Sequence, residues 1–175
     1  MKQLLILFIG LNCLTAKHPE TPEENMYPLS NPVQTVTDLF IATDRGDWNT
    51  LHQLFAPEVR LDYSSMNGQP AQILTPKAIS SAWKSILPGF EYTHHQIGNF
   101  NSKSTETTAK VFCYGTAQHY LSDPQGSVWT VVGSYDFELQ LIHKEWRITA
   151  MTFHYKFQTG NSSLIKKAQE HAKTH

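Results

Sequence analysis

The chain has 175 residues, of which 40% are hydrophobic, so it is long enough for one domain with a sizeable core. Its 14 basic and 15 acidic residues nearly cancel, and no basic stretch indicates a surface for nucleic acid or lipid. We therefore expect neither nucleic acid nor a membrane surface as its partner.

The first 16 residues, MKQLLILFIGLNCLTA, have the pattern of a secretory signal peptide: one lysine, an apolar run over residues 4–11, and small residues up to Ala16. The run is too short to span a bilayer, so no membrane span is expected. Cleavage after Ala16 predicts a secreted or periplasmic protein in which Cys113 is the only cysteine, without a disulfide. A buried N-terminal strand and lipidation of Cys13 remain as alternatives.

The next segment, residues 17–31, is polar and contains three prolines, which predicts an extended linker. The folded domain is expected over residues 32–160. Residues 161–175 are expected to form a tail or a short helix.

Three helices are predicted at the start of this domain, at residues 32–45, 48–56 and 76–87, with Asp47 and Thr75 as caps of the second and the third. A proline opens the first and the third, and Gly46, Pro57 and Pro88 end the three in turn. Alternating patterns then predict strands at residues 58–63, 91–100, 108–121, 128–142 and 146–157. Helices followed by a meander of long strands predict an α+β domain, with helices on one face of a curved antiparallel sheet.

The strand at residues 108–121 has one face of small side chains and one face of large aromatic ones. Small side chains leave room for a ligand against the sheet, so we assign the small face to a cavity. A helix packed there would fill the same space and is the alternative. The residues expected to line the cavity are Phe40, Trp83, Val111, Cys113, Tyr135 and Phe137.

Two adjacent histidines, His94 and His95, must point to opposite faces if their segment is a strand. His95 shares its face with Ile97, which indicates that His95 points inward. Asp44 lies four residues after Phe40, on the apolar stripe of the first helix, where an unpaired carboxylate would be costly. We expect His95 to pair with Asp44; the alternative is a helix-end aspartate that points to water.

Several segments together resemble the SnoaL-like branch of the nuclear transport factor 2-like superfamily: ATDRGDWNTLHQLFAPEVRLDY, LPGFEYTHHQIGNF, AQHYL, VVGSYDFEL and EWRI. Residues 44–63 are similar to scytalone dehydratase and bile-acid dehydratase relatives. The resemblance covers about residues 30–158 and implies a cone-shaped barrel with a deep apolar pocket. Because this scaffold carries many reactions, the resemblance predicts the fold more firmly than the chemistry.

The resemblance also implies roles for four residues. Asp44 in TDRGDW would fix His95 in THHQIG as a base. His119 in AQHY matches a second catalytic histidine, which would act as the acid that protonates a leaving hydroxyl. Tyr63 in LDY matches a pocket tyrosine that binds an oxygen or a water. Such a site predicts a cofactor-independent dehydratase or isomerase acting on a small apolar hydroxy-carbonyl compound.

The sequence departs from that family at two places. Thr43 stands where the family has a tyrosine, and Tyr135 and Phe137 stand where it has small polar residues. The pocket is therefore expected to be more apolar, with fewer polar anchors.

Other functions stay open at this point. A non-catalytic carrier of a small hydrophobic ligand needs only the cavity. A zinc site is disfavoured because no HxH or HExxH spacing is present, and no metal or organic cofactor is expected.

The aromatic face of the sheet carries Phe112, Tyr114 and Tyr120, which predicts that this outer face is buried in a homodimer.

Overall fold

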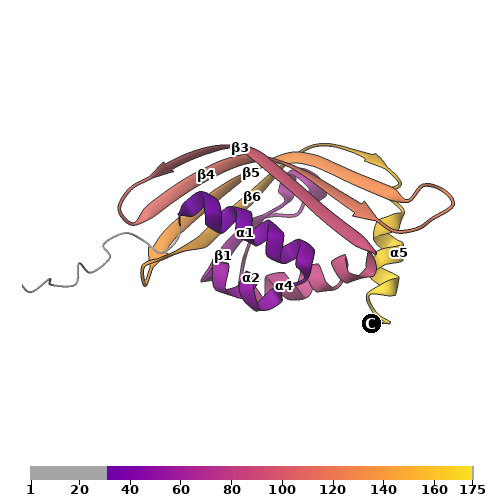
Figure 1. The fold of residues 1–175 in the computed structure, drawn as a ribbon, viewed down its shortest axis with the longest axis horizontal. Helices are drawn as coiled ribbons and strands as arrows, with labels where there is room; N and C mark the ends of the chain where they lie inside the picture. Colours follow the sequence, from indigo (N-terminus) through magenta and orange to yellow (C-terminus); the bar gives the residue numbers. More distant parts are fainter. Residues whose placement is uncertain (1–30, 175) are drawn as a thin grey trace, which may run out of the picture.

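The computed structural model describes residues 31–174 of the chain. The predicted signal peptide, Cys13 and nearly all of the predicted linker lie outside these residues. One curved six-stranded sheet dominates the structure. Helices α1 (Pro32–Arg45), α2 (Trp48–Leu54) and α4 (Pro76–Lys84) cover one of its faces (Figure 1). The α+β layout predicted above is confirmed. Within residues 31–174, no helix is long and apolar enough to cross a membrane.

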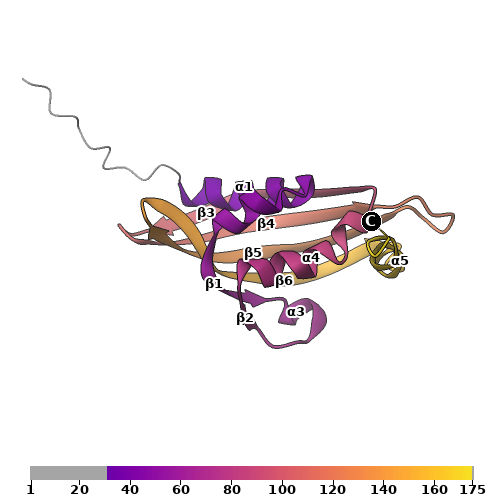
Figure 2. The ribbon, with the colours of Figure 1, turned by 90° about the horizontal axis from the view of Figure 1, so that it is seen from below.

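The four long strands form an antiparallel meander: β3 (Tyr92–Ser104), β4 (Thr108–Tyr120), β5 (Val128–Ile142) and β6 (Glu145–Gly160). The sheet order is β2-β1-β6-β5-β4-β3, with β1 (Phe55–Asp62) parallel to β6 and β2 (Gln72–Leu74) antiparallel to β1. The short β2 and α3 (Ser64–Asn67) were not predicted, and Figure 2 shows them together beyond β1. Both are short and largely exposed, so neither carries a periodic apolar pattern.

Helix α1 (Pro32–Arg45) carries Asp44, the predicted partner of His95, in its last turn. The Asn31 side chain accepts a hydrogen bond from the Gln34 backbone at 2.8 Å and caps the start of the helix. Gly46 ends it in the left-handed conformation at φ 64°, which glycine adopts without steric cost. These two caps fix where the helix begins and ends, and they place Asp44 directly before the turn.

Pro57 does not end the second helix. Helix α2 (Trp48–Leu54) stops three residues earlier, and Pro57 lies inside strand β1. Proline cannot donate to a regular ladder, but the β1–β6 pairing shifts register between Phe55 and Arg60, and Pro57 lies in this irregular stretch. The prediction was wrong because the sequence pattern does not reveal this irregularity.

The inward and outward faces of β4 are those predicted. Ala109, Val111, Cys113 and Ala117 are buried, whereas Lys110, Tyr114 and Tyr120 are exposed.

Aromatic rings from neighbouring strands occupy much of the space above the small residues. A Cβ atom at Gly115 would lie 2.4 Å from Cε2 of Tyr135, and one at Gly133 would lie 2.4 Å from Cε2 of Phe153. The small face therefore accommodates rings of the protein itself as well as a cavity.

The remaining helices close one end of the layer. Helix α4 (Pro76–Lys84) leads into a 3-10 turn, η1 (Leu87–Gly89), and α5 (Leu164–His171) packs against that turn (Figure 1). A Cβ atom at Gly89 would lie 1.8 Å from the Ala168 carbonyl oxygen, so only glycine permits this close approach. Helix α5 lies within the C-terminal segment for which a tail or a short helix was predicted.

Candidate active site

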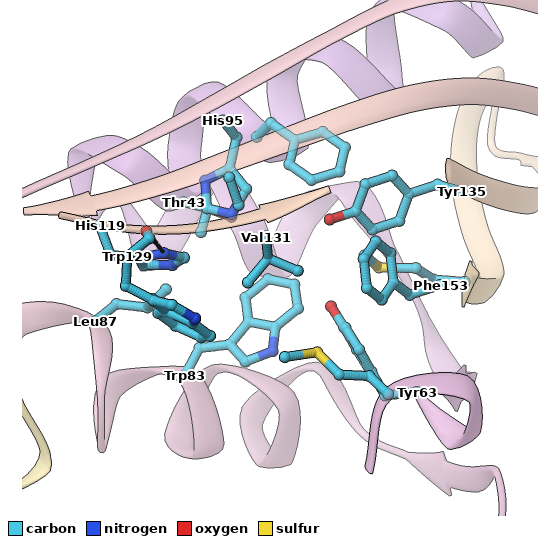
Figure 3. Close-up of a pocket in the computed structure, with 14 residues that line it drawn as sticks. Thr43, Tyr63, Trp83, Leu87, His95, His119, Trp129, Val131, Tyr135 and Phe153 are labelled. Carbon is cyan, nitrogen blue, oxygen red and sulfur yellow. Dashed lines mark hydrogen bonds between the residues drawn. The ribbon is translucent and has the colours of Figure 1, made fainter. Parts of the chain in front are cut away.

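A cavity of about 170 Å³ lies between the helices and the inner face of the sheet, and it is mostly apolar. Its lining comes from α1, α3, α4 and η1 on one side and from β3, β4, β5 and β6 on the other. Figure 3 shows two histidines, His95 and His119, on one side of this cavity and two tyrosines, Tyr63 and Tyr135, on the other. Apolar groups, among them Val131 and Phe153, fill the rest of the wall.

The Asp44 carboxylate and His95 form the predicted pair. Nδ1 of His95 lies 2.7 Å from Oδ1 of Asp44, and the backbone N–H of His95 donates to Oδ2 at 2.7 Å. The Thr93 hydroxyl donates to Oδ1 at 2.9 Å. The side chains of His95 and Asp44 are 12% and 19% exposed, so the pair is mostly shielded from water.

These contacts determine the protonation of Asp44. Burial alone would raise the pKa of its carboxyl group, but the hydrogen bonds and charge of His95, with a smaller contribution from Thr93, outweigh burial and lower that pKa. Asp44 is therefore an anion near neutral pH. A carboxylate only accepts hydrogen bonds, so Nδ1 of His95 carries a proton.

This arrangement leaves Nε2 of His95 available for chemistry. Asp44 does not line the cavity, whereas His95 does. The ring of His95 packs 5.4 Å from Phe40, centroid to centroid, and 5.9 Å from His119. Asp44 thus acts from behind His95, and the ring of His95 is what a ligand would meet.

His119 is a buried, neutral histidine. It is 6% exposed and stacks on Trp129 with ring centroids 4.6 Å apart, and Phe90 lies 4.9 Å away. Burial, with a smaller contribution from the nearby His95, lowers the pKa of His119 to about 4. Nδ1 lies 3.4 Å from the Trp129 carbonyl oxygen, which can only accept, so Nδ1 holds the single proton. Nε2 of His119 is then a hydrogen-bond acceptor near neutral pH.

Two tyrosine hydroxyls point into the cavity (Figure 3). Neither the Tyr63 nor the Tyr135 hydroxyl has a hydrogen-bond partner among residues 31–174. Burial raises the pKa of both groups, so each remains a protonated donor. The cavity wall therefore offers two hydrogen-bond acceptors, the Nε2 atoms of the two histidines, and two hydrogen-bond donors, the hydroxyls of the two tyrosines.

The structure brings together most of the predicted site residues. His95, His119, Tyr63, Phe40, Trp83 and Tyr135 all line the cavity. Val111, Cys113 and Phe137, which were expected to bind the substrate, do not line it and are at most 1% exposed in the core. They lie farther along β4 and β5, where the rings of Phe40 and Phe137 pack 6.1 Å apart and fill the space. Burial raises the pKa of the Cys113 thiol to about 12, so this thiol is unreactive.

Sequence reasoning missed several wall residues: Thr43, Met66, Leu87, Ala117, Trp129, Val131, Met151 and Phe153. Ala117, Trp129 and Val131 could have been found, because they share the inward face of β4 and β5 with the predicted residues. Met66 and Leu87 come from α3 and η1, which are too short to show a periodic apolar pattern. In the part of the chain that the structure describes, no three His, Cys, Asp or Glu side chains are grouped as metal ligands.

Residues 33–152 match the family model of the SnoaL-like domain, and the chain belongs to this family. The sequence resemblance described above is thereby confirmed. No curated protein sequence matches the chain.

Solved structures share the fold. The protein Kfla4162 from Kribbella flavida is 20% identical with a TM-score of 0.72, covering 77% of this chain and 93% of its own. A proposed scytalone dehydratase from Novosphingobium aromaticivorans is 18% identical with a TM-score of 0.64, covering 74% and 84%. A type 2 hexachlorocyclohexane dehydrochlorinase, LinA, is 12% identical with a TM-score of 0.62, covering 74% and 86%. At these identities the similarity establishes the fold and no more.

Proposed function

We propose that this protein is a cofactor-independent lyase or isomerase that removes a proton next to a carbonyl group of a small, mostly apolar hydroxy-carbonyl compound. The observation that carries the proposal is the Asp44–His95 pair, in which Asp44 accepts three hydrogen bonds and His95 faces the cavity. Structural neighbours described as a dehydratase and as a dehydrochlorinase support elimination chemistry on this scaffold.

The first step is proton abstraction. Nε2 of His95 takes the proton from the carbon beside the carbonyl, and the electron pair of that C–H bond moves to the carbonyl oxygen to form an enolate. The anionic Asp44 stabilises the imidazolium that results. The Tyr63 hydroxyl donates a hydrogen bond to the enolate oxygen, where the negative charge develops.

The second step returns the proton. In an elimination, the enolate electrons form the new C=C bond while the C–O bond of the β-hydroxyl breaks, and the imidazolium of His95 protonates the departing oxygen to give water. In an isomerisation, the same proton goes to another carbon. His119 was expected to act as the acid, but a neutral ring with a bare Nε2 suits another role: it accepts a hydrogen bond from the substrate hydroxyl and orients it.

The size of the cavity limits the substrate. A volume of about 170 Å³ is close to that of an engineered apolar cavity of ~150 Å³ that holds one benzene molecule. We therefore expect a compound of about one six-membered ring and not a polycyclic steroid. A cyclic β-hydroxy ketone such as 3-hydroxycyclohexanone fits this volume, and its dehydration to cyclohexenone can be followed by ultraviolet absorption.

The competing function is a carrier that binds a small hydrophobic ligand without turnover. The two are separated by Asp44→Asn, tested against Asp38→Asn on the same helix. An enzyme loses roughly 10²- to 10⁴-fold in the dehydration rate with Asp44→Asn, because the base is no longer oriented and charged correctly, while affinity for cyclohexenone stays the same. Equal rates in wild type and Asp44→Asn would reject the catalytic proposal.

Two further parts of the proposal concern location and assembly. The pattern of residues 1–16 supports export from the cytoplasm. Exposed aromatic side chains on the outer sheet face, including Tyr114 at 45% and Phe157 at 53%, support a homodimer in which that face is buried.

A further inference from the structure

Tyr135 is an aromatic residue of the inner sheet face whose polar atom is directed into the cavity and is not bonded to the described part of the protein. The residue is 5% exposed, and its hydroxyl has no hydrogen-bond partner among the residues that the structure describes. The hydroxyl is open to the cavity and not enclosed by protein: among the described residues, the only fully buried side-chain polar atom without a partner is Nε1 of Trp146. Phenylalanine would pack equally well here, and packing therefore does not explain the hydroxyl.

The ring of Tyr135 is held on several sides. Beneath it lies Gly115, where a Cβ atom would approach Cε2 of the ring to 2.4 Å and Cδ2 to 3.0 Å. The centroids of Phe153 and Phe40 lie 4.8 Å and 5.0 Å from its own. Phe137 stacks at 5.9 Å. A ring fixed in this way keeps its hydroxyl directed into the cavity before any ligand arrives.

The two tyrosine hydroxyls lie on the same side of the cavity. Figure 3 shows the Tyr63 hydroxyl and the Tyr135 hydroxyl both directed into the space that His95 and His119 face from the other side. They are close enough that ionisation of Tyr63 would oppose ionisation of Tyr135. Both remain protonated near neutral pH, so each can donate a hydrogen bond to an oxygen atom of a ligand.

We propose that Tyr135 and Tyr63 together form a two-donor site for one carbonyl or enolate oxygen of the ligand, with Tyr135 as a substrate-binding residue. This inference rests on the proposed function and specifies it further: the ligand presents its oxygen to the tyrosines and its acidic C–H bond to His95. Gly115 contributes to this site, because only a residue without a Cβ atom leaves room for the Tyr135 ring in its present position. The structure thus assigns to β5 a polar anchor that the sequence comparison with the family did not lead us to expect.

The test uses cyclohexanone and methylenecyclohexane as probes, which differ only by an oxygen in place of a CH₂ group. Affinity is measured by calorimetry, and the carbonyl stretching band of ¹³C-labelled cyclohexanone is recorded by difference infrared spectroscopy. Tyr135→Phe should weaken cyclohexanone binding by about 2- to 12-fold, the loss of one hydrogen bond, and leave methylenecyclohexane unaffected. The carbonyl band of bound cyclohexanone should shift to higher frequency, as it should in Tyr63→Phe.

Controls and a second variant keep the outcome clear. Tyr155→Phe removes a hydroxyl outside the cavity and should change neither the affinity for either probe nor the carbonyl band. Gly115→Ala should displace the Tyr135 ring and weaken cyclohexanone binding although no hydroxyl is removed. An unchanged band and affinity in Tyr135→Phe would overturn the proposal, and so would a wild-type protein that does not bind cyclohexanone.

These readouts do not depend on turnover. A protein that dehydrates no hydroxy ketone, but whose bound carbonyl band responds to both tyrosines, would refute the proposed catalysis and support the oxygen site. A protein whose turnover depends on Asp44, but whose bound carbonyl band does not change in Tyr135→Phe, would support the proposed catalysis and refute the oxygen site.

Discussion

Oδ1 of Asp44, on the last turn of α1, lies 2.7 Å from Nδ1 of His95, on β3. Oδ2 of the same carboxylate accepts the His95 backbone N–H at 2.7 Å, so both oxygens hold the same residue. Two bonds from one carboxylate to the ring and the backbone fix the position of His95 as well as its tautomer. This is the arrangement expected of a base that must meet a ligand in one orientation.

Thr93 is the third donor to Asp44, and removing its hydroxyl should impair the base without unfolding the protein. We expect Thr93→Val to lower the dehydration rate by about 2- to 10-fold, the loss of one hydrogen bond at 2.9 Å, and Thr93→Ser to restore it. The rate of 3-hydroxycyclohexanone dehydration is the readout. Thr116→Val, on the outer face of neighbouring β4, is the control and should have no effect; an unchanged rate in Thr93→Val would show that the hydroxyl is dispensable.

Burial of neutral His119 predicts a specific dependence of stability on pH. Its pKa falls from 6.5 to about 4 on folding, so the unfolded chain binds one more proton than the folded protein between these values. The free energy of unfolding should therefore decrease as the pH falls from about 6.5 to 4, by on the order of 3 kcal/mol in total for this group.

Urea unfolding at pH 7 and pH 5 measures this dependence. His119→Phe should lose much of the difference between the two pH values, whereas His94→Gln, at an exposed position on β3, should retain it. An identical pH dependence in wild type and His119→Phe would contradict the assignment of His119 as a buried neutral ring.

The outer sheet face makes a prediction about assembly. If this face is the homodimer interface, the wild type should have a dimeric mass by light scattering at micromolar concentration, and Tyr114→Glu should reduce it to the monomer. The control is Ile73→Glu, because Ile73 is 70% exposed but lies on β2 at the other edge of the sheet. A monomeric wild type would refute the dimer.

The long strands and the acid–base pair could be predicted from the sequence for the same physical reason. Strands β4 and β5 alternate along most of their length, and β3 alternates over residues 92–97, so the face of each residue there follows from its register. His95 could therefore be assigned inward from Ile97 alone. Asp44 could be assigned inward because it follows Phe40 by one helical turn.

What the sequence did not reveal lies in tertiary packing. The small side chains of β4 indicated that there is space above this strand. The sequence does not show which part of that space a neighbouring ring fills, as the Tyr135 ring does above Gly115, because this depends on side-chain conformation. The same holds for Val111 and Cys113, which share a face with cavity residues but lie deeper in the core. The protonation of His119 likewise depends on Trp129 and Phe90, which come from other elements.

The most direct test of the central claim is the tautomer of His95 at pH 8, read from ¹H–¹⁵N correlation spectra of the histidine rings. We predict that His95 in the wild type carries its proton on Nδ1 and leaves Nε2 bare toward the cavity, and that Asp44→Asn disturbs this preference while Asp38→Asn does not. If the wild-type ring instead carries its proton on Nε2, His95 cannot act as the base, and the catalytic account is contradicted.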